Sequence, residues 1–441
     1  MRAASLVRFL AESKSECFVN AILGRIVPGS PQYRDVGTVG AVTVESRLTR
    51  SHHEMAFTIG IPRETEADET RVSLVPEVAS RLLKMQEGLD IVVESGAGAK
   101  AFHRDDQYEE AGCTVVDRAD AFDADLVAKV APPSEEELDF FSEGQALVGL
   151  LDPLNRPEAA QTLAERGVTS FAMELVPRIS RAQKMDALSA MSSIGGYRAA
   201  VLAAERLPRF FPLLTTAAGT VKPAQVLVLG AGVAGLQAIA TAKRLGARVF
   251  GYDIREPTRE EVESLGAKFV ELEVDIDGDQ DESGYAEELE KEKQERQPEL
   301  LKPHLAEADV VISTALIPGR PAPLLINENA VAAMDPGSVI VDLAAPNGGN
   351  CAHTQAGETV VEDEVRIMGP TNLPAQMPVH ASQLYAKTIS ATIEEFVEDG
   401  TITPDFDDEI FDGACLTHDG EVRNERVREA LGLGEPATED E

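Results

Sequence analysis

The stretch VLVLGAGVAG constrains the fold of this chain more than any other feature. It places Gly230, Gly232 and Gly235 in the spacing G-x-G-x-x-G, directly after an apolar run typical of a strand. A long alanine-rich stretch of helical character follows, and a second apolar run, ARVFGYD, ends at Asp253 about 20 residues on. A strand, a glycine turn, a helix and a second strand with a terminal acidic residue form the unit that binds dinucleotides.

Each of these residues meets a requirement of dinucleotide binding. Gly230 permits the tight turn, Gly232 lets the backbone approach a pyrophosphate, and Gly235 lets the helix pack on the strand. The helix N-terminus then presents unpaired amides to the phosphates. Asp253 accepts hydrogen bonds from ribose hydroxyls and repels a 2′-phosphate, so NAD(H) is favoured over NADP(H), although Arg255 can meet a phosphate. The alternative is a nucleotide fold that binds nothing.

Strands and helices alternate from Met55 onward, which predicts parallel sheets with helices on both faces. The stretch VPEVASRLLKMQEG is an amphipathic helix, with Val78, Leu82 and Met85 on one face. A long helix is predicted over 381–398 as a return crossing to the first half of the chain. Its candidate buried residues are Leu384, Ile389, Ile393 and Phe396.

The charge excludes several classes of partner. The 441 residues include 40 basic and 76 acidic ones, for a net charge of -36. Such a field repels phosphate backbones and anionic membrane surfaces, which argues against nucleic-acid binding. Most of the basic residues are Arg, and two interpretations stay open: a halophile-like protein of a salt-rich cytoplasm, or an acidic protein of an ordinary cell.

The cysteines and the apolar runs indicate a reduced, cytoplasmic protein. Four cysteines lie far apart without metal-ligand spacing, so no zinc site or disulfide framework is expected. No uncharged apolar run reaches the roughly 18 to 20 residues of a membrane span, so any membrane role is expected to come through a partner.

The two ends differ from the rest of the chain. Residues 1–54 are slightly basic and lack a clear helix or strand pattern. They are either a targeting leader or an extension without a structural role, and Glu12 and Glu16 favour the extension. Residues 431–441 are expected to form a frayed acidic tail.

The stretch PRISRAQKMDALSAM is the most unusual polar segment. It places five polar residues within ten positions, and these are Arg178, Arg181, Gln183, Lys184 and Asp186. The pattern fits neither a core helix nor a solvated charged face. One interpretation is an Arg178–Asp186 ion pair that joins two domains; the other is a ligand site.

Several long motifs resemble the alanine dehydrogenase and transhydrogenase superfamily, and most closely the NAD(H)-binding components of proton-translocating transhydrogenases. The resemblance extends from Met55 to about Val422 and rests on RETEADETRVSLVP, ESGAGAKAF, RISRAQKMDALS, VLGAGVAGLQAIATAKRLGA, TALIPGRPAP, GSVIVDLAAPNGGN and TNLPAQMPVHASQLYAK. It implies an α/β fold with two Rossmann-like parallel-sheet domains and a nucleotide cleft between them. Residues 55–187 plus 372–430 would form the first domain, closed by its C-terminal segment, and 188–371 the NAD(H)-binding domain.

The resemblance also implies the roles of site residues. Gln183 would reach between two nicotinamides, with Arg178, Asp186 and Ser189 completing a catalytic polar group. Residues at the nicotinamide end of the cofactor would be Arg178, Ile179, Ser180 and Arg181. Further cofactor contacts would come from Val233, Asp253, Ile254, Arg255, Gly284, Tyr285, Gln297 and Leu316. Tyr285 has the alternative of an ordinary loop residue, and no metal is implied.

The function that the resemblance implies is that of a transhydrogenase subunit, active only with partner subunits. Hydride would pass directly from NADH here to NADP+ on an NADP(H)-binding subunit, coupled to proton movement through a membrane-spanning subunit. The resemblance further implies a homodimer, held at the inner face of the cytoplasmic membrane by its partners. Because both nicotinamides carry the chemistry, the protein would supply alignment rather than an acid or a base.

Two other functions remain as alternatives. An amino-acid dehydrogenase such as alanine dehydrogenase needs proton transfer and a grip on a carboxylate. Arg71 and Lys129 stand where that family keeps its gripping residues, but ALVGLLDPLNRPEA has no histidine where that family places its acid/base. The third possibility is a non-catalytic NAD-binding protein.

Overall fold

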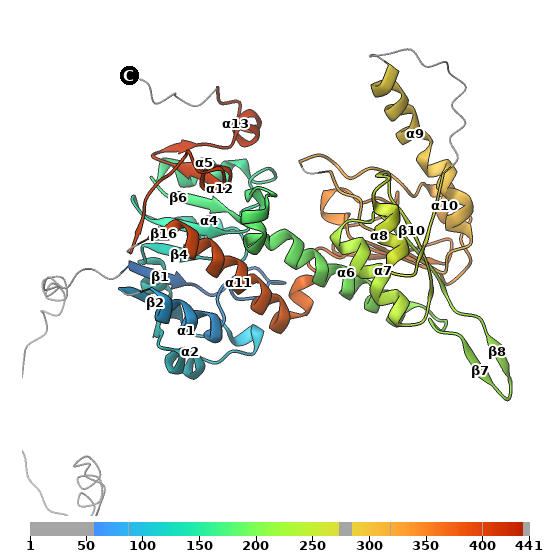
Figure 1. The fold of residues 1–441 in the computed structure, drawn as a ribbon, viewed down its shortest axis with the longest axis horizontal. Helices are drawn as coiled ribbons and strands as arrows, with labels where there is room; N and C mark the ends of the chain where they lie inside the picture. The colour runs from blue at the N-terminus through green and yellow to red at the C-terminus, as the bar shows by residue number, and fades with distance from the viewer. Residues whose placement is uncertain (1–56, 87, 273–284, 318, 399, 435–441) are drawn as a thin grey trace, which may run out of the picture. The chain divides into compact units, whose positions relative to one another are not determined.

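A computed structural model describes residues 57–86, 88–272, 285–317, 319–398 and 400–434 of the chain. The side chains of residues 285–295 are not among those described. The extension 1–54 and most of the acidic tail therefore lie outside the described residues. Two mainly parallel sheets, of eight and seven strands, organise the rest (Figure 1).

The first sheet has the strand order β19-β18-β6-β5-β4-β1-β2-β3. Its strands are β1 (Phe57–Ile61), β2 (Leu89–Glu94), β3 (Thr114–Val116), β4 (Leu126–Ala128), β5 (Ala146–Gly149), β6 (Thr169–Ala172), β18 (Cys415–His418) and β19 (Glu421–Val422). The six strands from the first half of the chain pair in parallel, whereas β18 pairs antiparallel with β6 and with β19. The sheet is thus mixed rather than purely parallel, because the C-terminal segment adds its strands to one edge.

Helices cover both faces of this sheet. They are α1 (Pro76–Met85), α2 (Asp105–Ala111), α3 (Arg118–Phe122), α4 (Glu135–Leu138), α5 (Pro157–Glu165), α11 (Pro378–Phe396), α12 (Glu409–Ala414) and α13 (Glu425–Leu431). Leu126 and Ala128 of β4 join the core on one face, and Val127 joins the core on the other, as alternation along a strand requires.

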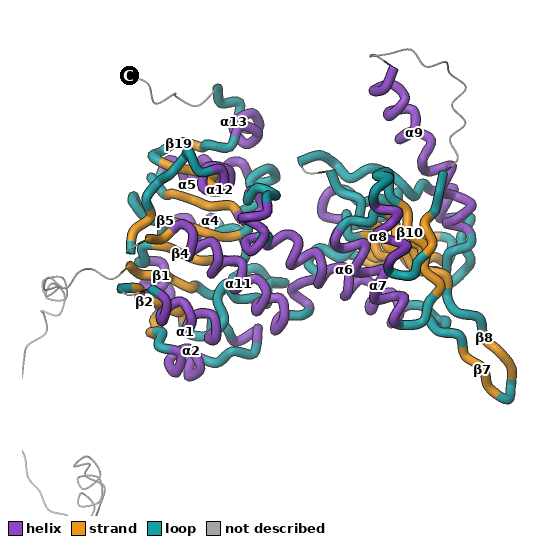
Figure 2. The backbone as a smooth tube through the Cα atoms, viewed as in Figure 1, coloured by secondary structure: helices purple, strands orange, loops and turns teal. Residues whose placement is uncertain are grey.

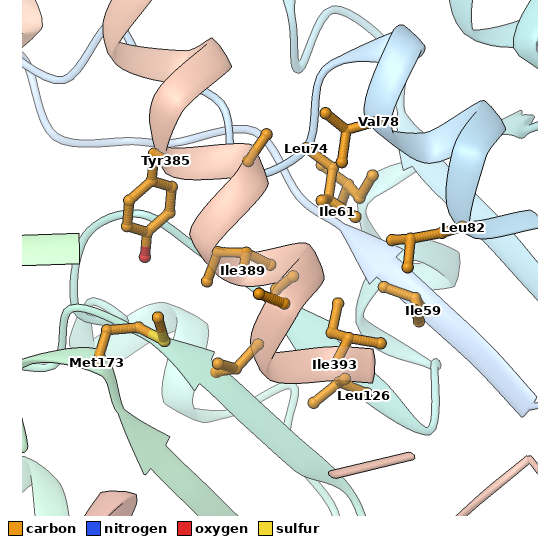
Figure 3. Packing of buried hydrophobic residues seen from close by; sticks show 14 of the residues in the cluster. Ile59, Ile61, Leu74, Val78, Leu82, Leu126, Met173, Tyr385, Ile389 and Ile393 are labelled. Carbon is orange, nitrogen blue, oxygen red and sulfur yellow. The ribbon is translucent and has the colours of Figure 1, made fainter. Parts of the chain in front are cut away.

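Helix α11 packs its apolar face on the first sheet beside α1. Ile389 and Ile393 point toward β1, close to Leu82 of α1 (Figure 3). Phe396 is also buried, as predicted, but Leu384 is 37% exposed because it lies on the other side of the helix. The prediction for Met85 was likewise wrong: it ends α1 with its side chain 60% exposed.

The second sheet has the order β11-β10-β9-β12-β13-β15-β14. Its strands are β9 (Gln225–Leu229), β10 (Arg248–Tyr252), β11 (Lys268–Phe269), β12 (Val310–Ser313), β13 (Val339–Asp342), β14 (Thr359–Glu362) and β15 (Val365–Met368). Only β14 is antiparallel, through a hairpin with β15 that the sequence patterns did not predict. The helices of this half are α6 (Ala187–Arg206), α7 (Val233–Arg244), α8 (Thr258–Ser264), α9 (Tyr285–Ala306) and α10 (Glu328–Val331).

The two sheets share one winding order. Taken in chain order, the parallel strands of each follow 3-2-1-4-5-6, with β1 next to β4 in the first sheet and β9 next to β12 in the second. In such sheets, ligands bind outside the carboxyl ends of the strands where the winding reverses. A two-stranded hairpin of β7 (Leu214–Thr216) and β8 (Gly219–Val221) belongs to neither sheet (Figure 2).

Helices α6 and α7 approach each other very closely at Gly196. A Cβ atom on Gly196 would lie 2.0 Å from the carbonyl oxygen of Ala234 in α7. The neighbouring Gly195 has room, since its Cβ would meet only Leu343 Cδ2, at 3.8 Å. The Gly-Gly pair in α6 therefore contains one glycine that the packing requires and one that it does not.

We predict that Gly196→Ala destabilises the protein and that Gly195→Ala, its matched control, does not. The added methyl at Gly196 forces α7 away, and overpacking of this kind costs about 1–3 kcal/mol. At Gly195 the gain in helix propensity is about 0.5–1 kcal/mol. Thermal unfolding of the two variants beside the parent measures this, and equal midpoints for both variants would contradict the close packing.

Candidate functional site

The glycine turn lies at the carboxyl end of β9, at the point where the second sheet reverses its winding. Gly230 has φ 92°, which only glycine adopts without strain. A Cβ on Gly235 would lie 1.8 Å from the carbonyl oxygen of Gly230, so the helix packs directly on the turn. A Cβ on Gly232 would meet nothing within 4 Å. The middle glycine thus faces open space at the start of α7, where a pyrophosphate needs close access to the backbone.

Residues at the ends of β12 and β13, which the sequence patterns did not reveal, hold the neighbouring loops in place. Thr314 donates a hydrogen bond from Oγ1 to the carbonyl oxygen of Gly230, at 3.0 Å. The fully buried Asp342 accepts hydrogen bonds from Ser313 Oγ (2.9 Å) and from the backbone amide of Asn350 (2.7 Å). Asn350 in turn holds the backbone of residue 315 through its side-chain amide. A polar residue ending an apolar strand, as in GSVIVDLAA, was the available signal.

Asp253 follows β10, next to the glycine turn. Its carboxylate accepts a hydrogen bond from the amide of Ala231 at 2.7 Å. It also accepts three hydrogen bonds from Arg255, one from the amide and two from the guanidinium, each at 2.9 Å. Although burial opposes ionisation, Arg255 and the backbone amides hold the pKa of Asp253 below its ordinary value. The carboxylate is therefore charged, and a ribose hydroxyl would have to share it with Arg255.

Three apolar side chains around the glycine turn are unusually exposed. Val233 is 43% exposed, Leu316 50% and Ile254 67%, and they follow β9, β12 and β10 respectively. Apolar side chains at the carboxyl ends of adjacent strands suit the flat faces of a base, because ligand pockets are lined mostly by apolar groups.

The segment Pro177–Ser189 divides into free and occupied side chains. Arg178, Ser180 and Gln183 are exposed, and the structure gives their side chains no hydrogen bond or ion pair with any described residue. The interpretation of Arg178 as the partner of Asp186 is therefore not what the structure has. Ile179 packs, half-buried, against the core of the first sheet.

Arg181 is directed at the C-terminal segment. Its guanidinium lies 2.5 Å from Asp408, the N-cap of α12, and 3.6 Å from Glu395 of α11. Lys184 binds the same Glu395, at 3.0 Å. These two cations thus fasten the segment to α11 and α12, which differs from the cofactor contact expected for Arg181.

Asp186 and Ser189 form the start of α6. Asp186 accepts hydrogen bonds from the amide of Ser189 at 2.8 Å and from its hydroxyl at 2.6 Å. This is an N-cap, in which the carboxylate satisfies amides of the first turn. The pair fixes where the exposed segment ends and the helix begins.

The remaining predicted cofactor contacts belong to the region around α9. Gly284 lies outside the described residues, and Tyr285 begins α9 with a side chain that is not described. Gln297 is buried and hydrogen-bonded to the phenol of Tyr252, which ends β10. Gln297 therefore joins α9 to the second sheet, a different position from the cofactor contact expected for it.

A buried charge network lies where the first sheet reverses its winding. Lys129, fully buried after β4, pairs with Glu64 at 3.0 Å and with Glu137 at 3.3 Å. Burial raises the pKa of Glu64 above its ordinary value even though Lys129 lies beside it. Arg71 forms a two-pronged pair with Glu69, at 2.8 and 2.6 Å. Both cations of the expected carboxylate grip are thus already paired with carboxylates of this chain.

One cavity, of about 440 Å³, lies away from the glycine turn. Its lining includes Thr70, Arg206, Glu358, Asn372 and Gln376, and none of the residues predicted to bind the cofactor. We therefore place the candidate site by the strand ends and the glycine turn, whose geometry meets the needs of a dinucleotide.

Within the described ranges, no helix has the length and apolarity to cross a bilayer. Those same ranges hold no cluster of three or more His, Cys, Asp or Glu residues suited to a metal ion.

The residues present fit a dinucleotide. The open approach at Gly232, the helix start at Val233, the carboxylate of Asp253 and the exposed Leu316 surround the carboxyl ends of β9, β10 and β12. Arg178 and Gln183 are available to a ligand because no described residue engages them.

Known proteins with similar sequences and structures support this assignment. Models described as alanine dehydrogenase/PNT, N-terminal domain and C-terminal domain, match residues 60–195 and 199–425. The chain is 44% identical over 374 residues to the first of the NAD(P) transhydrogenase subunit alpha polypeptides of Rhodospirillum rubrum, covering 82% of this chain and 97% of the relative. It is 30% identical over 398 residues to the alanine dehydrogenase of Bacillus subtilis, covering 87% and 98%.

A solved structure of transhydrogenase from Sinorhizobium meliloti superposes with a TM-score of 0.75 at 42% identity, covering 83% of this chain and 99% of that one. The motif resemblance and the α/β fold with two sheets are thus confirmed. The matching models and the extent of identity establish that the chain belongs to the alanine dehydrogenase/PNT family.

Proposed function

We propose that the chain is the NAD(H)-binding alpha subunit of a proton-translocating transhydrogenase, in which hydride passes from NADH to NADP+ on a partner subunit. The observation that carries this proposal is the 44% identity to the Rhodospirillum rubrum transhydrogenase subunit along almost its entire length. Mixing the purified chain with an NADP(H)-binding transhydrogenase component and following hydride transfer is the test.

Membership of the family implies NAD(H) binding, and the second sheet offers the groups for it. Gly232 and the start of α7 would receive the pyrophosphate, and Asp253 the ribose hydroxyls. Val233, Ile254 and Leu316 would contact the base or the nicotinamide through their exposed surfaces. When bound, NADH supplies the hydride.

The segment before α6 would position the nicotinamide. Arg178, Ser180 and Gln183 are its exposed side chains without described partners, so they are free to bind. Asp186 and Ser189 would act by fixing the start of α6 rather than by touching the cofactor. Alignment of this kind needs no titrating group, since a correct approach of the reacting atoms lowers the barrier by itself.

The finer assignments rest on resemblance to the family. Gly284, Tyr285 and Gln297 would close over or support the cofactor, Arg181 would join them at the nicotinamide end, and Ile179 would line that end. The protein would be a homodimer bound to a membrane-spanning subunit and an NADP(H)-binding subunit, at the inner face of the cytoplasmic membrane. Residues 55–187 plus 372–430 would form one domain and 188–371 the other, a division that the two separate sheets support.

The buried charges of the first sheet disfavour the alanine dehydrogenase alternative. A substrate carboxylate would have to displace Glu69 from Arg71, or Glu64 and Glu137 from Lys129. Removing one partner of a buried ion pair leaves an uncompensated charge and costs about 3–5 kcal/mol.

We predict that the parent chain binds NADH in strong preference to NADPH and that Asp253→Asn narrows this preference by about tenfold. One such factor corresponds to about 1.4 kcal/mol of charge repulsion. Arg255→Ala should widen the preference, because it removes the cation that neutralises Asp253. Nucleotide fluorescence titration measures both affinities, and Arg259→Ala, an exposed arginine on α8, is the control. An unchanged ratio in Asp253→Asn would remove Asp253 from the ribose site.

We predict that Gln183→Asn binds NADH within about tenfold of the parent but transfers hydride far more slowly. Losing one neutral hydrogen bond costs only about 0.5–1.5 kcal/mol. A misplacement of reacting groups by one methylene can slow transfer about a hundredfold. Single-turnover transfer measured beside NADH affinity separates the two effects, and Gln161→Asn on α5 is the matched control. A transfer rate that falls only as far as binding weakens would make Gln183 an ordinary binding residue.

We predict that the purified chain produces no NADH from NAD+ and alanine and reduces no pyruvate with NADH. The cations Arg71 and Lys129 are held by buried carboxylates, and β5 and the turn after it carry no histidine. Steady NADH formation with alanine, followed by absorbance, would overturn the transhydrogenase assignment.

A further inference from the structure

Glu174 connects the ends of two adjacent strands in the first sheet. It lies in η3 (Met173–Leu175), directly after β6, and its carboxylate crosses to the turn that follows β5. One oxygen accepts the backbone amide of Leu151 at 3.2 Å, and the other accepts the amide of Asp152. Three residues later the chain reaches Pro177, where the exposed segment with Arg178 and Gln183 begins.

The turn that Glu174 binds is strained. Asp152 has φ 49°, a left-handed conformation that is uncommon for residues other than glycine. Such conformations persist where the surroundings hold them, and they cluster at functional sites. Asn155 donates a hydrogen bond to the side chain of Asp152 at 2.8 Å, and Glu174 holds the amide of Asp152 from the other side. The carboxylate of Glu174 is thus one of the groups that maintain this turn.

No cation pairs with Glu174 among the described residues. From the turn after β5 it faces the carboxylate of Asp152, and Arg156 of that turn lies 3.8 Å from Glu66 instead. From α11 it faces the phenol of Tyr385, whose hydroxyl donates to the carbonyl oxygen of Lys129.

The other elements packed against η3 bring no free charge to Glu174. Asp186 of α6 caps its own helix, and Asp412 of α12 pairs with Arg423. Burial, reinforced by Asp152 and opposed only by backbone amides, raises the pKa of Glu174 to about 7.

We propose that Glu174 is a positioning residue for hydride transfer, whose ionised carboxylate ties the turn after β5 to the start of the nicotinamide-facing segment and whose protonation loosens this tie. The proposal rests on the proposed function, since the segment in question carries Arg178 and Gln183. An ionised carboxylate accepts both amides, whereas a protonated one loses acceptor strength on one oxygen.

The direction of the pH effect follows from the raised pKa. Because the folded protein favours protonated Glu174, the associated stability is present below the ordinary glutamate pKa and is lost as the pH rises through about 7. Over the same interval the carboxylate becomes charged and grips the turn. The protein therefore gains order at the segment while losing some global stability, and transfer should accelerate with rising pH.

The test is the pH profile of single-turnover hydride transfer between NADH on the full chain and NADP+ on an NADP(H)-binding component. We expect the parent rate to rise about tenfold across the titration of Glu174, the ratio that corresponds to one pKa unit of coupling. Glu174→Gln, which cannot ionise, should give a flat profile at the low rate, with NADH affinity changed less than about twofold. Glu158→Gln on α5, an exposed site, should keep the parent profile.

Two further measurements keep the result interpretable. Glu174→Asp should restore the pH dependence at a reduced rate, because it keeps the ionisable group on a shorter side chain. Infrared difference spectra should show a protonated carboxyl that disappears as the pH passes about 7 in the parent and is missing from Glu174→Gln. A rise retained in Glu174→Gln, or a flat parent profile, would overturn the role of Glu174. The absence of transfer in the parent at every pH would instead overturn the proposed function.

Discussion

The close packing of α7 on the glycine turn is the constraint on which the second half of the structure depends. A side chain at Gly235 would collide with the carbonyl oxygen of Gly230, and one at Gly196 would collide with that of Ala234. Two glycines thus bring α7 against β9 on one side and against α6 on the other. This contact directs the first turn of α7 at the open space beside Gly232, and it also anchors α6, which begins where the nicotinamide-facing segment ends.

The first sheet repeats the winding of the second but has a different content at the point of reversal. Where the second sheet has a glycine turn and open space, the first has Glu64, Lys129 and Glu137 in mutual contact. Burying these charges is favourable only when each one is paired. The same winding order therefore gives an open nucleotide site in one sheet and a closed charge network in the other, in keeping with a subunit that binds one nucleotide.

The segment between the sheets combines firm attachment with free side chains. Arg181 and Lys184 bind Glu395 and Asp408 of the C-terminal segment, and Asp186 caps α6. These attachments hold the backbone while leaving Arg178 and Gln183 exposed. A site that aligns two cofactors needs this arrangement, because binding groups are useful only when their own positions are fixed.

The sequence by itself determined the local elements and the nucleotide turn, because periodicity, glycine spacing and strand-end acids depend on neighbours in the chain. It predicted β1, α1, α7 and α11, and it placed Asp253 beside the turn. Only the tertiary structure decided that Arg181 and Gln297 are engaged elsewhere, that Arg255 covers Asp253, and that Glu174 holds the turn after β5. Partners of this kind lie up to 227 residues apart, as Arg181 and Asp408 do, so no local pattern encodes them. The same holds for Lys129, whose motif suggested a substrate grip until folding supplied its carboxylates.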